Sequence, residues 1–196
     1  MQGLIKVILN LFSRKFLIKI SLILKPFFEL IFRGDRFVDP INNKSYSYFF
    51  PYGYNKLRKN ALSPGTLSLE RHRLLWIFLE KETDFFNAKN KILHIAPEQC
   101  FYKSFKKNFE SYTTCDLNSP IAEIRADVCN LPFDENEFDF VLCNHVLEHV
   151  YDDEKAMKEI YRVLKYEGKA ILQVPVDNAL EKTIDGRDIS DQNLRN

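Results

Sequence analysis

Carboxylates and imidazoles follow several short runs that predict strands in this chain of 196 residues. Asp116 follows the run at residues 111–115, and a carboxylate placed there can accept hydrogen bonds from both vicinal hydroxyls of a ribose. The competing interpretation is a solvated aspartate that begins the turn at residues 117–120. His145 and His149 lie just beyond another run, where an imidazole can accept a proton from a hydroxyl group. For His149, a local capping or packing role is favoured.

These residues need strands to position them, and the second half of the chain predicts such strands. Residues 138–143 form a nearly all-apolar run, typical of a parallel strand buried on both faces. Apolar residues recur at helical spacing over 152–165, after three carboxylates in the first turn, where the helix dipole favours them. We expect Gly168 to stop this helix and residues 170–174 to form a parallel strand after a right-handed crossover. The predicted fold class is α/β.

A longer pattern in this region is shared with a known family. It runs from an acidic residue and Leu-Pro-Phe (127–133) through Phe-Asp-Phe-Val (138–141) and Val-Leu-Glu-His-Val (146–150) to a helix and a Gly-Lys strand. The pattern resembles class I S-adenosylmethionine-dependent methyltransferases of the small-molecule type (type 11), over residues 90–178. The resemblance implies a Rossmann-like, doubly wound, mostly parallel sheet and S-adenosylmethionine as cofactor.

Residues 91–96 predict the first strand of the sheet. The loop that follows this strand departs from the family's pattern. The family carries an acidic residue and then alternating glycines, which let the backbone approach the methionine part of the cofactor. Here those places hold His94, Ala96, Glu98 and Cys100, with Pro97 between them. The loop resembles a subgroup that reads His-Ile-Ala-Pro-Glu, which implies that Glu98 meets the cofactor's amino group. Loss of cofactor binding is the alternative.

The same resemblance implies the remaining cofactor contacts. Asp116 matches the ribose-binding acid, Asp127 would accept from the adenine amine, and Val128 would donate its backbone N–H. By composition alone, Asp127 is only a polar strand end. Because strand ends line the crevice of an open parallel sheet, residues 96–100, 116–117, 127–128 and 144–145 should converge there. The expected cofactor-binding residues are His94, Ala96, Pro97, Glu98, Asp116, Leu117, Asp127, Val128 and Asn144.

Methyl transfer from a sulfonium is an in-line displacement with a neutral leaving group, so a protein mainly supplies alignment and desolvation. A nearby proton acceptor helps if the acceptor is a hydroxyl, and His145 is then either that catalytic base or lining of the cofactor pocket. We expect Glu148 to face solvent or hold a neighbouring backbone group. The expected acceptor is a small molecule, a lipid-linked intermediate or a glycan.

A non-catalytic cofactor-binding or membrane-associated scaffold of the same fold is the alternative function. The altered loop favours it, as does the short segment of 20 residues after Val176. We therefore expect the sheet to be truncated after its fifth strand, which would become an exposed edge. A nicotinamide-binding protein is disfavoured because the glycine fingerprint is absent.

Residues 1–32 form an apolar but basic extension. Five Lys and Arg residues interrupt it, so no run reaches the ~20 apolar residues of a spanning helix, and a signal peptide does not fit. The pattern predicts a basic amphipathic helix broken at Pro26. We expect residues 1–25 to lie on an anionic membrane surface, with packing on the domain or a partner, or a lid over the substrate cleft, as alternatives.

Residues 33–67 resemble a degenerate zinc ribbon that precedes the same core in relatives. Asp39, Asn42, Ser63 and Thr66 stand where those relatives carry two cysteine pairs, and these side chains do not supply four thiolates for tetrahedral zinc. We therefore predict no metal and a small β-ribbon supported by aromatic packing. Aromatic and basic residues together would also suit single-stranded nucleic acid, but a packed hairpin with solvated charges is favoured.

Charge and cysteine content add two further expectations. Residues 1–90 hold fifteen Lys and Arg against seven Asp and Glu, whereas residues 91–196 hold thirteen against twenty. Only the first half thus suits an anionic partner. The four cysteines lack metal-ligand spacing and indicate free thiols in a reducing compartment. We expect a cytoplasmic protein, peripheral on the inner face of the membrane where the extension binds, with a methyltransferase domain over residues 68–196.

Overall fold

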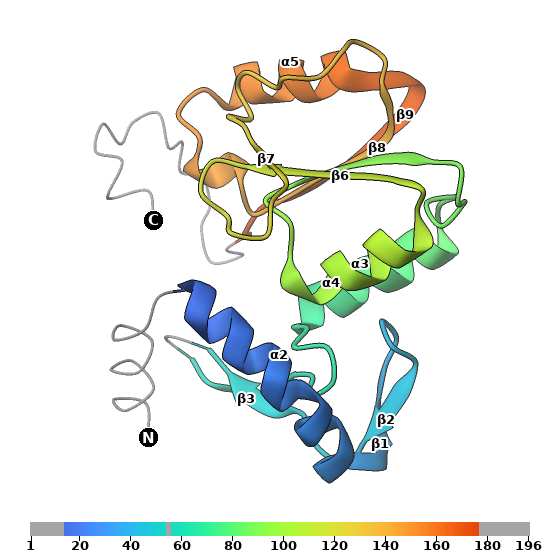
Figure 1. Ribbon diagram of the computed structural model, residues 1–196, viewed down its shortest axis with the longest axis vertical. Helices are drawn as coiled ribbons and strands as arrows, with labels where there is room; N and C mark the ends of the chain where they lie inside the picture. The colour runs from blue at the N-terminus through green and yellow to red at the C-terminus, as the bar shows by residue number, and fades with distance from the viewer. Residues whose placement is uncertain (1–13, 54–55, 177–196) are drawn as a thin grey trace. The chain divides into compact units, whose positions relative to one another are not determined.

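The computed structural model describes residues 14–53 and 56–176, and the chain forms two compact units, residues 1–83 and 84–196 (Figure 1). The boundaries at residues 32 and 67 that the sequence suggests stay predictions. No helix among the described residues is both long enough and apolar enough to cross a membrane.

The described residues of the first unit form two helices and two antiparallel ribbons. Helix α2 (Arg14–Ile31) is followed by β1 (Arg33–Asp39) paired with β2 (Lys44–Tyr46), by β3 (Phe50–Tyr52) paired with β4 (Arg58–Leu62), and by α3 (Glu70–Lys81). Phe28 and Phe32 of the α2 end contact Phe50 edge-on, with ring centroids 5.4 and 4.9 Å apart. The helical and β-ribbon extension predicted from the sequence is therefore present.

Helix α2 continues through Pro26 to Ile31, so the predicted break at Pro26 is wrong. A proline inside a helix removes one backbone hydrogen bond and crowds the preceding turn. The five residues after Pro26 nevertheless stay helical, and two aromatic rings among them, Phe27 and Phe28, lie against each other with centroids 6.5 Å apart. The contact of Phe28 with Phe50 is a tertiary interaction that offsets part of this cost.

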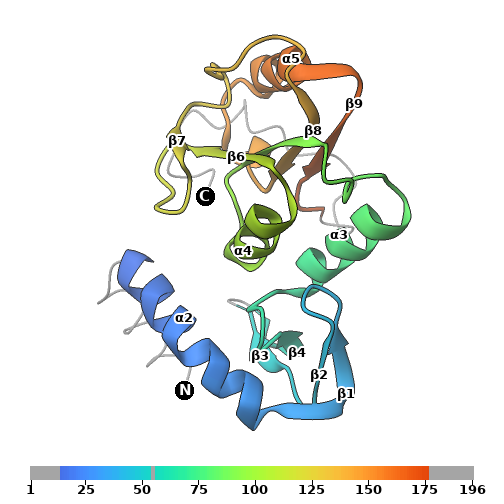
Figure 2. The same ribbon diagram turned by 45° about the vertical axis from the view of Figure 1, so that its right-hand side comes forward.

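The second unit is built on a parallel sheet. Its elements are β5 (Lys91–Ile95), α4 (Gln99–Asn108), β6 (Ser111–Asp116), β7 (Ile124–Arg125), β8 (Phe138–Asn144), the 3-10 turn η1 (Leu147–His149), α5 (Asp153–Val163) and β9 (Leu164–Gln173). The strand order is β7-β6-β5-β8-β9, and every pair is parallel. Figures 1 and 2 show α5 and α4 on opposite faces of this sheet. The predicted α/β class with a Rossmann-like parallel sheet is confirmed.

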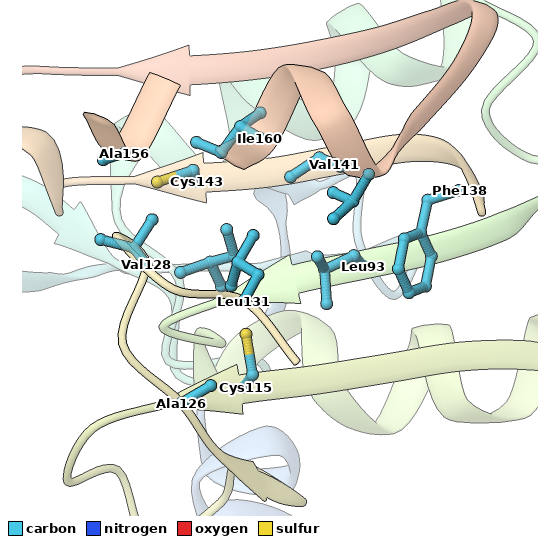
Figure 3. Packing of buried hydrophobic residues seen from close by; sticks show 12 residues of the cluster. Leu93, Cys115, Ala126, Val128, Leu131, Phe138, Val141, Cys143, Ala156 and Ile160 are labelled. Atoms are coloured by element: carbon cyan, nitrogen blue, oxygen red, sulfur yellow. The ribbon is translucent and has the colours of Figure 1, made fainter. Parts of the chain in front are cut away.

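Alternating side chains of the central strands fill two cores. On the α5 face, Leu93 of β5, Val141 of β8 and Ile160 of α5 belong to one buried cluster, seen in Figure 3. On the α4 face the core is aromatic: Phe85 lies edge-on to Phe140, at a centroid distance of 5.1 Å, and near Phe105. Because β5 is buried on both faces, its residues alternate between an aliphatic and an aromatic environment.

The helix α5 ends at Val163 rather than at Gly168, so the predicted stop is wrong. Strand β9 begins at once, and its pairing with β8 shifts between Phe138 and Phe140, so that Gly168 lies in an irregularity of the strand. A Cβ at Gly168 would come within 2.9 Å of the Lys165 carbonyl oxygen. Glycine is required there by a close backbone approach and not by a helix end.

The strand predicted at residues 121–126 is much shorter, because only Ile124 and Arg125 pair with β6. The preceding segment is instead held by hydrogen bonds from side chains. The Asp116 carboxylate and the Thr114 hydroxyl both accept from backbone N–H groups between residues 118 and 123.

Candidate functional site

The carboxyl ends of β5, β6 and β8 lie side by side. Ile95 is aligned with Cys115 on one side and with Cys143 on the other. The segments that follow, residues 96–98, 116–117 and 144–145, therefore emerge at one edge of the sheet. An open parallel sheet binds ligands at this edge.

The loop after β5 has a fixed backbone. Ala96 has φ +51°, in the left-handed region that favours glycine, and its N–H donates to the Cys115 carbonyl at 2.9 Å. Pro97 is buried and has a ring-constrained φ. Alanine thus adopts, at some conformational cost, a left-handed backbone turn that glycine would adopt more readily.

His94 connects this loop to the aromatic core. It is fully buried, with ring contacts to Phe101 and Phe105 of α4. Its Nδ1 lies 2.8 Å from the Tyr112 hydroxyl, and its Nε2 lies 2.5 Å from Oε2 of Glu98. The imidazole therefore links Tyr112 of the neighbouring strand β6 to Glu98 at the start of α4.

Burial, and to a smaller extent the Glu98 carboxylate, raises the pKa of Tyr112, so this phenol keeps its proton. It can then donate to Nδ1 of His94, in the tautomer whose Nε2–H donates to the Glu98 carboxylate. Glu98 is the N-cap residue of α4, where the helix dipole favours a carboxylate. Its Oε1 accepts from Asn144 Nδ2 at 3.2 Å. Glu98 is thus held from two sides.

Buried polar atoms without a hydrogen-bond partner among the described residues gather at this edge. Asn144 Oδ1 belongs to a residue only 4% exposed, and Gln173 Oε1 comes from the neighbouring end of β9. Ser119 Oγ and Glu148 Oε2 follow β6 and β8. Since a buried polar atom without a partner costs about 1–3 kcal/mol, such a group indicates a place for ligand atoms.

His145 follows β8 with φ +54°, and its backbone N–H donates to the Gln173 carbonyl at 2.8 Å. Its Nδ1 lies 3.2 Å from Glu148 Oε1. Glu148 therefore pairs with His145 and does not simply face solvent as expected. Glu148 contacts only Nδ1, so the other ring nitrogen, Nε2, is not part of this pair. The His145 side chain is 31% exposed. His149 is exposed in η1.

The structure shows the turn-forming role of Asp116, whereas its ribose-binding role stays a prediction. Its Oδ1 accepts from the backbone N–H groups of Asn118 and Ser119, at 2.7 and 2.5 Å, which shapes the turn. Its Oδ2 has no hydrogen bond within the described part of the chain, so this oxygen can still accept from a ligand hydroxyl. Leu117, next to it, is 50% exposed.

Asp127 and Val128 lie in the turn after β7. Asp127 is exposed, and its Oδ1 accepts from the Cys129 N–H at 2.9 Å. The Val128 side chain is buried in the cluster on the α5 face (Figure 3). Only backbone atoms of Val128 could therefore contact an adenine. The structure places these residues beyond the short β7, two strands away from Glu98.

Thiol chemistry is disfavoured at this site. Burial raises the pKa of Cys115 and of Cys143 to about 12, so both stay protonated near neutral pH. The pKa of Cys129 is also raised by burial. None of the four cysteines, all of which lie among the described residues, forms a disulfide.

The four positions that the sequence comparison likens to a degenerate zinc ribbon lie together in the first unit. Asp39 is fully buried and accepts hydrogen bonds from the Thr66 hydroxyl at 2.5 Å and from the Ile41 N–H at 3.0 Å. Ser63 Oγ accepts from the Thr66 N–H at 3.4 Å. A Cβ on Gly65 would approach Asn42 Nδ2 to 2.7 Å. Among the described residues no group of three or more His, Cys, Asp or Glu could hold a metal ion; the absence of a metal site in the whole chain stays a prediction.

Sequence reasoning missed Tyr112, Gln173 and the pairing of Glu148 with His145. The Glu148–His145 spacing of three residues is a usable signal, because residues three apart meet within a helical turn. Tyr112 has no such signal, since its hydroxyl reaches His94 only through the parallel alignment of β5 with β6.

Part of the second unit is similar to known proteins. Residues 87–172 match a family model described as a methyltransferase domain. An uncharacterized protein of Methanocaldococcus jannaschii, MJ0638, is 48% identical over 60 residues, which are 31% of this chain and 26% of that protein. The 2-phytyl-1,4-naphthoquinone methyltransferase of Nostoc punctiforme is 44% identical over 52 residues, 26% of this chain and 23% of that enzyme.

The matched segments thus span about a quarter of the length of these curated relatives. Among solved structures, the YcgJ protein of Bacillus subtilis aligns with a TM-score of 0.45 and 22% identity, over 53% of this chain and 50% of that one.

Proposed function

We propose that the second unit binds S-adenosylmethionine at the carboxyl edge of its parallel sheet and transfers the methyl group to a small-molecule or lipid-linked acceptor. The observation that carries this proposal is the pair formed by the Glu98 carboxylate and the buried, unpartnered Asn144 Oδ1. Both are hydrogen-bond acceptors at one place, and one of them is anionic. Such a pair fits the cationic amino group of an amino acid.

Other residues of the edge fit the remaining parts of the cofactor. Asp116 Oδ2 can accept from ribose hydroxyls while Oδ1 keeps the turn in place. Asp127 and the backbone of Val128 are assigned to the adenine. His94 and Ala96 are assigned to holding the loop after β5 in place. Pro97 and Leu117 are assigned to the lining of the cofactor site. The match of residues 87–172 to a methyltransferase domain supports these assignments.

S-adenosylmethionine supplies a methyl group on a sulfonium, which leaves as a neutral thioether. The chain's own contribution is then to orient the reactants and to exclude water. His145 can also accept the proton of a hydroxyl acceptor, because Glu148 holds its Nδ1 and leaves Nε2 for that task. The Nostoc relative is named for a naphthoquinone with a phytyl chain, which supports an apolar small molecule as the acceptor.

Calorimetric titration of the full chain with S-adenosylmethionine and S-adenosylhomocysteine tests the proposal, with NADH as a control ligand. We expect saturable binding of the first two alone. Asp116→Asn keeps an acceptor oxygen for the turn but replaces Oδ2 with a donor, so it should weaken binding about tenfold to a hundredfold. Folded wild-type protein that binds neither ligand, or an unchanged affinity for Asp116→Asn, would contradict the assignments.

His145→Gln separates catalysis from binding. With a hydroxyl acceptor, it should lower turnover about 10²-fold or more, while the affinity for S-adenosylhomocysteine changes little. A parallel loss of affinity would instead assign His145 to the lining of the cofactor pocket.

A further inference from the structure

Helix α2 exposes a continuous apolar stripe. The residues follow one another at spacings of three, four or one along the helix, so they share a single face. Their exposed fractions range from 37% to 73%. The α2 stripe consists of Phe16, Ile20, Ile23, Leu24, Phe27, Leu30 and Ile31.

The other side of the helix end is already occupied by the first unit. Phe28 and Phe32 contact Phe50, and Glu29 pairs with Lys44 at 2.7 Å. These contacts fix which face of the helix points to the ribbons. The α2 stripe is therefore not the face that α2 uses to pack on β3.

The charge of this part of the chain is of one sign. Five Lys and Arg residues lie before the first acidic residue, Glu29. A helix that combines basic residues with a face of Phe, Ile and Leu is suited to lie in the plane of a bilayer interface, held by anionic lipids and by burial of the apolar face. A second copy of this helix would bring like charges together, so self-association is disfavoured.

We propose that α2 docks the protein on an anionic lipid bilayer, with the α2 stripe buried at the boundary between headgroups and acyl chains. The helix has 18 residues and lies along the surface. Attraction between the positive charge of this segment and anionic headgroups strengthens the binding. The proposal does not depend on methyl transfer, and it would also bring the chain to acceptors that reside in the membrane.

Cosedimentation of the full chain with vesicles tests this proposal. One set of vesicles is pure phosphatidylcholine, and the other is an equal mixture of phosphatidylcholine and phosphatidylglycerol. We expect binding to the mixed vesicles, weakened by salt and much lower on the neutral ones. Absence of binding to the mixed vesicles would overturn the proposal.

A pair of uncharged substitutions tests the α2 stripe itself. Ile23→Gln with Phe27→Gln removes two exposed apolar side chains and keeps good helix formers, so partition onto mixed vesicles should fall about 100-fold. The matched control, Val38→Gln with Leu57→Gln, changes residues of the same unit that are 58% and 50% exposed. It should bind within about twofold of wild type.

Three other results would refute the assignment of the stripe. The stripe variant could bind vesicles as well as the control does, which would reduce the interaction to charge alone. Light scattering could show a dimer that the stripe variant dissociates, which would assign the stripe to a second copy. Hydrogen exchange could show that amides of residues 84–176 exchange faster in the stripe variant than in wild type, in the absence of vesicles. That result would assign the α2 stripe to packing against the second unit.

Discussion

Tyr112→Phe removes one hydroxyl from the buried network without changing the packing around it. The phenylalanine ring can keep the edge contact with Phe105, whose centroid is 5.7 Å away. His94 then loses its partner at Nδ1 while it stays fully buried. A buried polar atom left without a partner costs about 1–3 kcal/mol, and the complete burial of His94 leads us to expect about 2 kcal/mol.

The single tryptophan, Trp76, lies in the first unit, so its fluorescence does not report on this site. Hydrogen exchange of peptides from residues 91–116 is the better assay. A loss of about 2 kcal/mol should speed exchange roughly thirtyfold when the amides open with their unit. Tyr161→Phe, at a residue that is 81% exposed, is the matched control and should leave exchange unchanged. Equal rates for Tyr112→Phe and wild type would refute the reasoning that this hydrogen bond satisfies His94.

Three further predictions concern other parts of the chain. Burial alone would raise the pKa of Asp139, but its lysine partner and a backbone N–H outweigh this and hold the pKa below its ordinary value. The contribution of Asp139 to the free energy of unfolding is therefore complete above its unfolded pKa and is lost as pH falls through the lower folded pKa. Asp139→Asn should lower the free energy of unfolding by about 1 kcal/mol at neutral pH and by almost nothing near pH 2, as measured by urea unfolding. Gly65→Ala places a Cβ 1.7 Å from the Tyr46 hydroxyl, and should destabilise the first unit by about 1–3 kcal/mol, followed by tryptophan fluorescence. Cys115 and Cys143, with pKa values of about 12, should resist iodoacetamide in the folded protein and react after unfolding, as measured by mass spectrometry.

Strands β5 and β8 could be predicted because their burial on both faces requires mostly apolar residues. The strand predicted at β6 also matches the structure within a residue or two, although serine and threonine make up half of it. The start of β9 could not be predicted in the same way, because it depends on pairing with Phe138 and not on local composition. Gly168 has the appearance of a helix stop in the sequence, whereas its role is set by a carbonyl of a neighbouring residue in the folded strand.

The sequence predicts which residues lie at the candidate site, but not which hydrogen bonds hold them there. Strand ends are visible in the sequence, so Asp116, Asn144 and His145 were found at the sheet edge. The partners that hold them were not, because the hydrogen bond between Asn144 and Glu98 joins residues 46 apart in the chain. The sequence also does not distinguish the two oxygens of Asp116, of which Oδ1 holds the turn by accepting from two backbone N–H groups.

The backbone at Ala96 and Pro97 has a consequence for the energetics of binding. A loop of alternating glycines stays adaptable until a ligand orders it, and each ordered residue then costs about 1–2 kcal/mol of conformational entropy. Here the left-handed conformation of Ala96 and the ring of Pro97 fix the conformation of the loop during folding. A ligand at this edge would meet a surface whose ordering is already complete. Its association should therefore show a small entropic penalty, and the chain would give up adaptability to differently shaped ligands in exchange.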